Sequence, residues 1–275
     1  MLDLAQQLVH ETVPVVAPKL DYVQTWLRVD PLIQAAEKEA IAQLIQYPNT
    51  PIRMIGHSMG GLIWLEVLNR HPDWWDNVQS LVLVASPVGG ADLGRILDPL
   101  ALGIGIAADL GKNRKPLAET IAAAIPTLVI AGDTDGGSDG TVTVACTQFA
   151  YAKFVCLPGL SHAAMRNHPL VAAVIREFWL GTAIGESVEA NAIIQKLRHV
   201  PGITDGHQRD FIKAKVEIEL PDGSTIRTWK NMVGVDHVFV ASPNGHCLYA
   251  GFVGWLHAPD LQQVLEQIKQ DMLTH

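Results

Sequence analysis

The sequence predicts an α/β fold: a mostly parallel sheet with helices on both faces, followed by a small α+β unit with an antiparallel sheet. In the first two thirds of the chain, short apolar runs bounded by glycine and proline alternate with stretches of helical spacing, which is typical of βαβ units. In the last third, pairs of short strands are joined by turn signals, which is typical of hairpins. We expect residues 1–183 and 184–275 to form separate domains.

The front of the chain supplies four of these elements before the first conspicuous motif. Residues 2–9 predict a helix, and residues 13–18 predict a strand. Residues 31–46 predict a second helix, because apolar side chains recur along it at helical spacing: Leu32, Ala35, Ala36, Ala40, Ile41 and Leu44. Residues 51–55 then predict a short buried strand, and residues 61–68 a helix.

A pentapeptide, Gly56-His57-Ser58-Met59-Gly60, stands between that strand and that helix. The pattern G-x-S-x-G between a strand and a helix indicates a nucleophile elbow, in which Ser58 occupies a sharp, strained turn. Bulky residues in place of Gly56 or Gly60 are expected to clash with the adjoining strand and helix. We expect His57 to pack beneath the turn rather than to transfer protons.

The rest of the first domain offers partners for such a serine. A strand over 126–132 ends in an acid-rich loop, 133–140, and a strand over 152–157 is followed by a loop that carries His162. An activated serine needs a base, and the base needs an orienting acid. In elbow-type sites the chain order is serine, acid, histidine, and loops at the carboxyl ends of strands meet at one edge of the sheet. The order found here matches.

Four segments together make residues 1 to about 183 similar to the lipases, esterases and thioesterases of the α/β-hydrolase superfamily. They are Gly56 to Gly61, Leu83 to Gly90, Ser138 to Val142 and Gly159 to His162. The resemblance implies Ser58 as nucleophile, His162 as general base and then general acid, and a carboxylate that holds the imidazole. It also implies the N–H of Met59 as an oxyanion donor, and it calls for no metal or organic cofactor.

Two carboxylates compete for the role of the acid. Asp139 is favoured by its Asp-Gly-x-Val surroundings, with Val142 opening the next helix, whereas Asp135 lies closer to the end of its strand. The carboxylate that is not used, like Asp133, is expected to be a solvated loop acid. Among the histidines, His168 is the competitor of His162, but its place before Pro169 predicts a surface or capping residue.

Residues 89–124 form an apolar, glycine-punctuated insertion where the resembled fold places a cap or lid. Its apolar residues include Leu93, Ile96, Leu97, Leu100, Leu102, Ile104 and Ile106. Such a segment suits a mobile cover that lines an acyl-binding pocket. An ordinary helix packed on the sheet is the alternative.

One expected segment does not precede the helix over 31–46. The resembled fold has a strand and a His-Gly loop there, and this loop normally supplies the second oxyanion donor. Either the true start lies upstream and this chain is shortened, which we favour, or the protein lacks half of the oxyanion hole. Loss of one donor typically costs about 100- to 1000-fold in turnover, so activity is expected to be impaired in the second case.

Composition excludes several classes of function. The formal net charge of −8 argues against nucleic-acid binding, which needs a clustered basic surface. No run of 18 or more apolar residues predicts a membrane span, and no signal peptide is apparent. The three cysteines are too few and too scattered for a disulfide framework or a metal cluster, so a reducing, cytoplasmic setting is expected. The oligomeric state stays open.

The last third predicts a small α–ββββ–α unit after a linker over residues 181–191. A helix over 188–200 and a closing helix over 259–272 flank two strand pairs, which are 211–219 with 225–230 and 235–241 with 247–253. We expect Trp229, Trp255 and Phe252 to be core aromatics. The pairs Asp236-His237 and His246-Cys247 are better explained by structural roles than as metal ligands.

The sequence thus predicts a serine hydrolase that cleaves a carboxylic ester or thioester of a hydrophobic acyl group by a Ser-Asp-His triad. The substrate would be a small molecule. The alternative is a catalytically silent hydrolase-fold protein that acts as a ligand- or partner-binding module.

Overall fold

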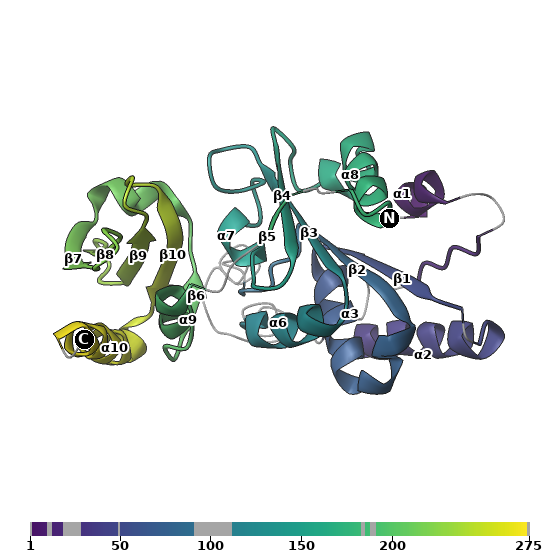
Figure 1. Cartoon of the computed structure of the whole chain (residues 1–275), viewed down its shortest axis with the longest axis horizontal. Coiled ribbons are helices and arrows are strands. Elements are labelled where there is room, and N and C mark those ends of the chain that lie inside the picture. Colours follow the sequence, from purple (N-terminus) through teal and green to yellow (C-terminus); the bar gives the residue numbers. More distant parts are fainter. Residues whose placement is uncertain are drawn as a thin grey trace. The chain divides into compact units, whose positions relative to one another are not determined.

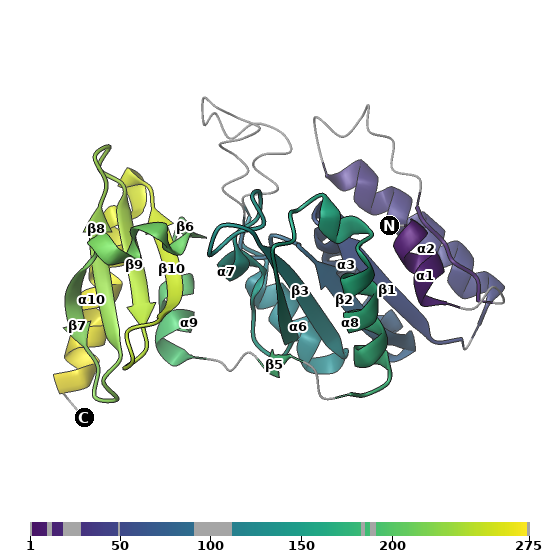
Figure 2. The same ribbon diagram turned by 90° about the horizontal axis from the view of Figure 1, so that it is seen from above.

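The computed structural model of the chain describes residues 2–9, 13–18, 29–48, 50–90, 112–182, 185–187 and 191–273. The chain divides into two compact units, residues 1–189 and 190–275, and each has its own sheet (Figure 1, Figure 2). The first unit has a parallel four-stranded sheet with one short antiparallel strand at its edge. The second has an antiparallel five-stranded sheet. The predicted fold class is confirmed.

Strands of the first unit follow the chain order across the sheet. They are β1 (Ile52–His57), β2 (Val78–Val84), β3 (Thr127–Asp133), β4 (Lys153–Pro158) and β5 (Glu186–Ser187). Strands β1 to β4 are parallel, and β5 pairs antiparallel with β4. Because all four parallel strands point the same way, their carboxyl ends and the loops that follow lie along one edge.

Helices cover both faces of this sheet, as an apolar parallel sheet requires. Successive side chains of a strand point to opposite faces, and in β2 Leu81 and Leu83 enter one core while Val82 and Val84 enter the other. The first core contains α3 (Met59–Arg70) and α6 (Lys115–Ala124). The second contains α1 (Leu2–Leu8) and α8 (Pro169–Trp179), which lie together on the opposite side in Figure 1.

The remaining helices of the first unit are peripheral to the sheet. Helix α2 (Asp30–Gln46) packs on α3 through its predicted apolar stripe, including Leu32, Ala36 and Ala40. The described residues of the unit also form three short helical turns: η1 (Pro72–Asn77), α7 (Val144–Thr147) and η2 (Ala164–Arg166).

Two predictions for the first unit need correction, and a third falls mostly outside the described residues. Residues 13–18 form no strand, and Pro14 and Pro18 lack the N–H groups that a ladder needs. Of the predicted cap over 89–124, residues 115–124 are the core helix α6, and residues 91–111, with all the apolar residues cited for the cap, lie outside the described residues. The predicted linker over 181–191 contains β5.

The second unit is a twisted antiparallel sheet with helices on one face (Figure 2). Its strands are β6 (Ile203–Asp205), β7 (Lys215–Glu219), β8 (Thr225–Lys230), β9 (Asp236–Ala241) and β10 (Cys247–Val253), in the sheet order β6-β10-β9-β8-β7. Helices α9 (Ala192–Arg198) and α10 (Ala258–Leu273) pack on the inward residues of this sheet, which include Ile226, Val238 and Val240.

The secondary structure of this unit differs from prediction in two places. The three-residue strand β6 was not predicted, because it is too short to show alternation. Residues 211–213, predicted to begin a strand, belong to the 3₁₀ helix η3 (Gln208–Lys213), and Phe211 of this helix packs edge-on against Phe239 at 5.8 Å between ring centroids.

None of the three aromatic residues expected in the core is fully buried: Trp229 and Phe252 are half-buried, and Trp255 is exposed. Trp255, expected to be a core residue, is 71% exposed in η4 (Trp255–His257), where its Nε1–H donates to the Val233 carbonyl at 2.9 Å. Asp236 forms an ion pair with Lys230 at 2.9 Å, and the His237 ring contacts Trp229 and Phe252. Both residues of this pair therefore have structural contacts.

Candidate active site

Ser58 occupies a strained backbone position between β1 and α3. Its φ of 55° and ψ of −126° lie where non-glycine residues are rare. The turn is held by β2, because the Ser58 N–H donates to the Val84 carbonyl at 2.8 Å. The Ser58 side chain does not cap α3. Its hydroxyl is therefore turned to another partner.

Close packing explains one glycine of the predicted pair but not the other. A Cβ on Gly56 would lie closer than 3.0 Å to the backbone of Gly60 and Gly61, where α3 crosses β1. A Cβ on Gly60 would meet nothing within 4 Å, so the expected clash at this position is wrong. Gly61 is the second tight position instead, because a side chain there would strike the Ser86 hydroxyl.

His162 stands between Ser58 and a buried carboxylate. The Ser58 Oγ lies 2.9 Å from His162 Nε2, and His162 Nδ1 lies 2.7 Å from Asp139 Oδ2. The other oxygen of Asp139, Oδ1, accepts from the backbone N–H groups of Thr141 at 2.9 Å and Val142 at 2.7 Å. A carboxylate can only accept from Nδ1, so this arrangement leaves Nε2 free to accept the serine proton.

The second candidate acid, Asp135, takes a different role. It is exposed, and its carboxylate accepts from the Ser138 N–H at 2.8 Å and the Ser138 hydroxyl at 2.7 Å. The structure brings Asp139, rather than Asp135, to His162. His168 also lies elsewhere: it caps α8 by accepting the Leu170 N–H on Nδ1 at 3.2 Å.

Asp133 organises the acid loop, although we expected it to be solvated. Its Oδ1 accepts three backbone N–H groups, those of Asp135, Gly136 and Gly137, at 3.2, 2.7 and 2.8 Å. Its carbonyl accepts the Gly159 N–H at 2.6 Å, which ties the acid loop to the histidine loop. An aspartate at a strand end before two glycines is an Asx-turn signal that could have predicted the first of these roles.

His57 contacts His162 rather than merely filling space under the turn. Its Nε2 lies 2.9 Å from the His162 carbonyl oxygen, and the two ring centroids are 4.8 Å apart. Burial, and next the positive charge that His162 can carry, lower the pKa of His57 from 6.5 to about 4. The ring is therefore neutral at physiological pH.

The lowered pKa of His57 predicts that the free energy of unfolding falls as the solution becomes acidic. The unfolded chain protonates this ring below pH 6.5, whereas the folded ring stays neutral down to about pH 4. The stabilisation that comes from the neutral His57 ring is fully present above pH 6.5. As the pH falls from 6.5 to 4, the free energy of unfolding decreases by about 3 kcal/mol for this reason. Urea unfolding at several pH values should show that His57→Gln loses less stability over this range than the parent. Equal losses would contradict the shift.

Met59, the residue directly after Ser58, offers a backbone donor at the start of α3. It is the first residue of α3, so its N–H has no acceptor within the helix. The positive end of the α3 dipole lies at the same point, and it favours negative charge there.

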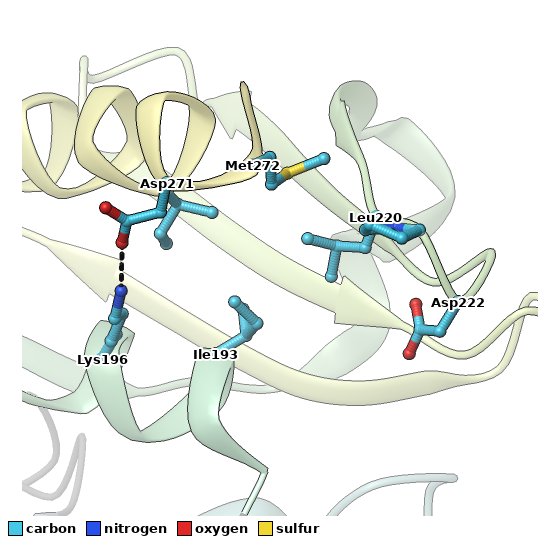
Figure 3. A pocket seen from close by; sticks show the side chains of 8 residues that line it. Ile193, Lys196, Leu220, Asp222, Asp271 and Met272 are labelled. Atoms are coloured by element: carbon cyan, nitrogen blue, oxygen red, sulfur yellow. Dashed lines mark hydrogen bonds and ion pairs between the residues drawn. The ribbon is translucent and has the colours of Figure 1, made fainter. Parts of the chain in front are cut away.

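Among the residues that the structure describes, no three His, Cys, Asp or Glu side chains gather as metal ligands would, and no helix is long and apolar enough to cross a membrane. The second unit has an open pocket of about 560 Å³ between α9, α10 and the β7–β8 turn (Figure 3). Its walls are mainly apolar, with a Lys196–Asp271 ion pair of 2.5 Å at the side, and none of the site residues above line it.

Comparison with known proteins gives one family match. Residues 34–116, which include β1, the Ser58 turn and α3, match the family model described as serine aminopeptidase, S33. A search of the curated proteins found no match.

Several solved structures match part of this chain. The mature form of the lipase BlEst2 from Bacillus licheniformis is 14% identical over 55% of this chain and 75% of its own, with a TM-score of 0.42. Its propeptide form is 13% identical over 82% of this chain and 62% of its own, with a TM-score of 0.47. The phospholipase PlaB from Legionella pneumophila is 18% identical over 57% of this chain, with a TM-score of 0.44, and this chain spans 49% of its length.

The family match and the fold of the first unit point the same way. The matched residues contain the strand, the strained turn and the helix, and the parallel sheet is covered by helices on both faces. Together they support the assignment of the first unit to the α/β-hydrolase superfamily.

Proposed function

We propose that this protein is a serine hydrolase that cleaves a carboxylic ester or thioester. The observation that carries the proposal is the hydrogen-bonded series from Ser58 through His162 to Asp139, with Ser58 on a strained turn. The apolar composition of residues 91–111 favours a hydrophobic acyl group. The same chemistry serves lipases, esterases and thioesterases, so the leaving group is decided by the shape of the pocket.

The proposed reaction has two steps, acylation and deacylation. His162 Nε2 takes the proton from the Ser58 hydroxyl as Oγ attacks the acyl carbon, and the oxyanion that forms accepts from the Met59 N–H. Collapse of this tetrahedral intermediate breaks the bond to the leaving alcohol or thiol, which takes its proton from His162. A water molecule then attacks the acyl carbon with His162 again as base, and the carboxylic acid leaves as the Ser58 hydroxyl is restored.

Asp139 would serve this cycle without exchanging protons. Its buried carboxylate holds the proton on His162 Nδ1 and stabilises the imidazolium that forms in each step. The two backbone N–H groups on its other oxygen keep the carboxylate in place.

Labelling with a fluorophosphonate, followed by intact mass, tests the proposal. We expect one adduct on the parent and none on Ser58→Ala, because the phosphonate reacts only with an activated serine. Ser161→Ala is the matched control: it removes an exposed serine beside His162 and should leave the label in place. Absence of the adduct on the parent would contradict the proposal and favour the silent, ligand-binding alternative. Persistence of the adduct on Ser58→Ala would contradict the assignment of Ser58 as the nucleophile.

A further inference from the structure

The backbone of His162 is held on both of its sides. Its N–H donates to the Asp139 carbonyl at 2.9 Å, and its own carbonyl lies 2.9 Å from His57 Nε2. The first bond anchors His162 to the acid loop, and the second joins it to the residue that precedes Ser58. The bond to Asp139 involves a residue that already has a role in the proposed reaction. The bond to His57 involves a side chain that the proposed reaction does not use.

Sheet topology shows why the second bond matters. Ser58 follows β1 and His162 follows β4, and β2 and β3 lie between these strands. The histidine loop therefore has to reach across two strands, because β1 and β4 share no ladder hydrogen bond with each other. The His57 side chain spans this gap directly.

In the hydrogen bond between His57 and the His162 carbonyl, His57 must be the donor. A carbonyl oxygen can only accept, so Nε2 of His57 must carry a hydrogen. A second positive charge beside the imidazolium of His162 would oppose the proposed reaction, and the pKa of about 4 keeps His57 neutral at physiological pH. His57 can then hold His162 as a neutral donor throughout the cycle.

We propose that His57 is a positioning residue, whose Nε2–H···O=C hydrogen bond to His162 sets the place of the His162 ring over Ser58. This inference rests on the proposed function. Because His57 and Ser58 are adjacent, the bond couples the nucleophile and its base through one peptide unit and one side chain. Misplacement of a catalytic group by about 1 Å can cost about 100-fold in rate, which is the scale of effect expected here.

Two substitutions separate the hydrogen bond from the titratable ring. His57→Gln keeps a side-chain N–H at nearly the same reach, whereas His57→Leu fills the space without a donor. We expect His57→Leu to slow fluorophosphonate labelling of Ser58 by about 10- to 100-fold, and His57→Gln to stay within about threefold of the parent. If His57→Gln is as slow as His57→Leu, or if His57→Leu labels like the parent, the inference is overturned.

His168→Leu is the matched control for the loss of a histidine. His168 lies six residues after His162 and makes a local cap on α8, so its loss is expected to lower stability without slowing the label. Circular dichroism of all variants shows whether each one is folded before rates are compared.

NMR of the imidazole groups tests the hydrogen bond from His57 to His162 independently of activity. In the parent we expect His57 as the Nε2–H tautomer and a downfield proton from His162 Nδ1–H on Asp139. The downfield proton should persist in His57→Gln and shift or vanish in His57→Leu. If the parent takes no label, the proposed function fails, but these spectra still test the positioning role of His57. An unchanged His162 Nδ1–H signal in His57→Leu would refute that role.

Discussion

Replacing Asp139 by asparagine is expected to slow the labelling of Ser58 by about 10⁴-fold while the protein stays folded. The asparagine carbonyl can keep the N–H groups of Thr141 and Val142, which bind Oδ1 in the parent. Its amide N–H₂ then faces His162 Nδ1 and donates to it. This donation forces the imidazole proton onto Nε2, and Nε2 can no longer accept from Ser58.

Asp135→Asn is the matched control for this prediction. Asp135 lies four residues earlier in the same loop, is exposed, and binds Ser138 rather than His162. We expect its labelling rate to stay near that of the parent. Rates of label incorporation, measured by intact mass over time, compare the variants. A slow Asp135→Asn with a fast Asp139→Asn would show that the acid has been misassigned.

The parts of the site that local chain geometry determines could be predicted from the sequence. A strand, a turn and a helix around Ser58 follow from apolar runs and glycines, and the order of the acid and histidine loops follows from the strands before them. The choice between Asp139 and Asp135 could not be settled that way. It depends on which carboxylate the backbone of residues 140–142 turns inward, and that is a tertiary contact.

Contacts between distant segments account for what the sequence did not show. The His57 bond to His162 joins residues 105 positions apart, so no local pattern encodes it. Residues 13–18 have the apolar composition of a strand, but pairing depends on a neighbour and on free N–H groups, which Pro14 and Pro18 lack. Trp255 reads as a core residue by its type alone, yet it follows the end of β10 and is largely exposed.

The two glycines of the elbow should respond to alanine in opposite directions. An alanine Cβ at Gly56 would overlap backbone atoms of Gly60 and Gly61, which cannot move aside as a flexible side chain can, so β1 and α3 must separate. We expect Gly56→Ala to lower the free energy of unfolding by about 3 kcal/mol, at the upper end of the usual cost of overpacking. Ser58 would lose its label as well, because the strained turn depends on that close crossing.

Gly60→Ala is a strict control for Gly56→Ala, because the substitution is the same and only the space around the added Cβ differs. Its Cβ meets nothing within 4 Å, and it lies in the first turn of α3, where alanine is favoured over glycine by about 0.5–1 kcal/mol. Urea unfolding, read by hydrogen exchange of the β1 and α3 amides so that the first unit is followed separately, would measure both variants. If both alanines destabilise α3 equally, the strain at the elbow does not arise from the β1–α3 crossing. If only Gly56→Ala does, backbone contact between β1 and α3 is what holds Ser58 in place.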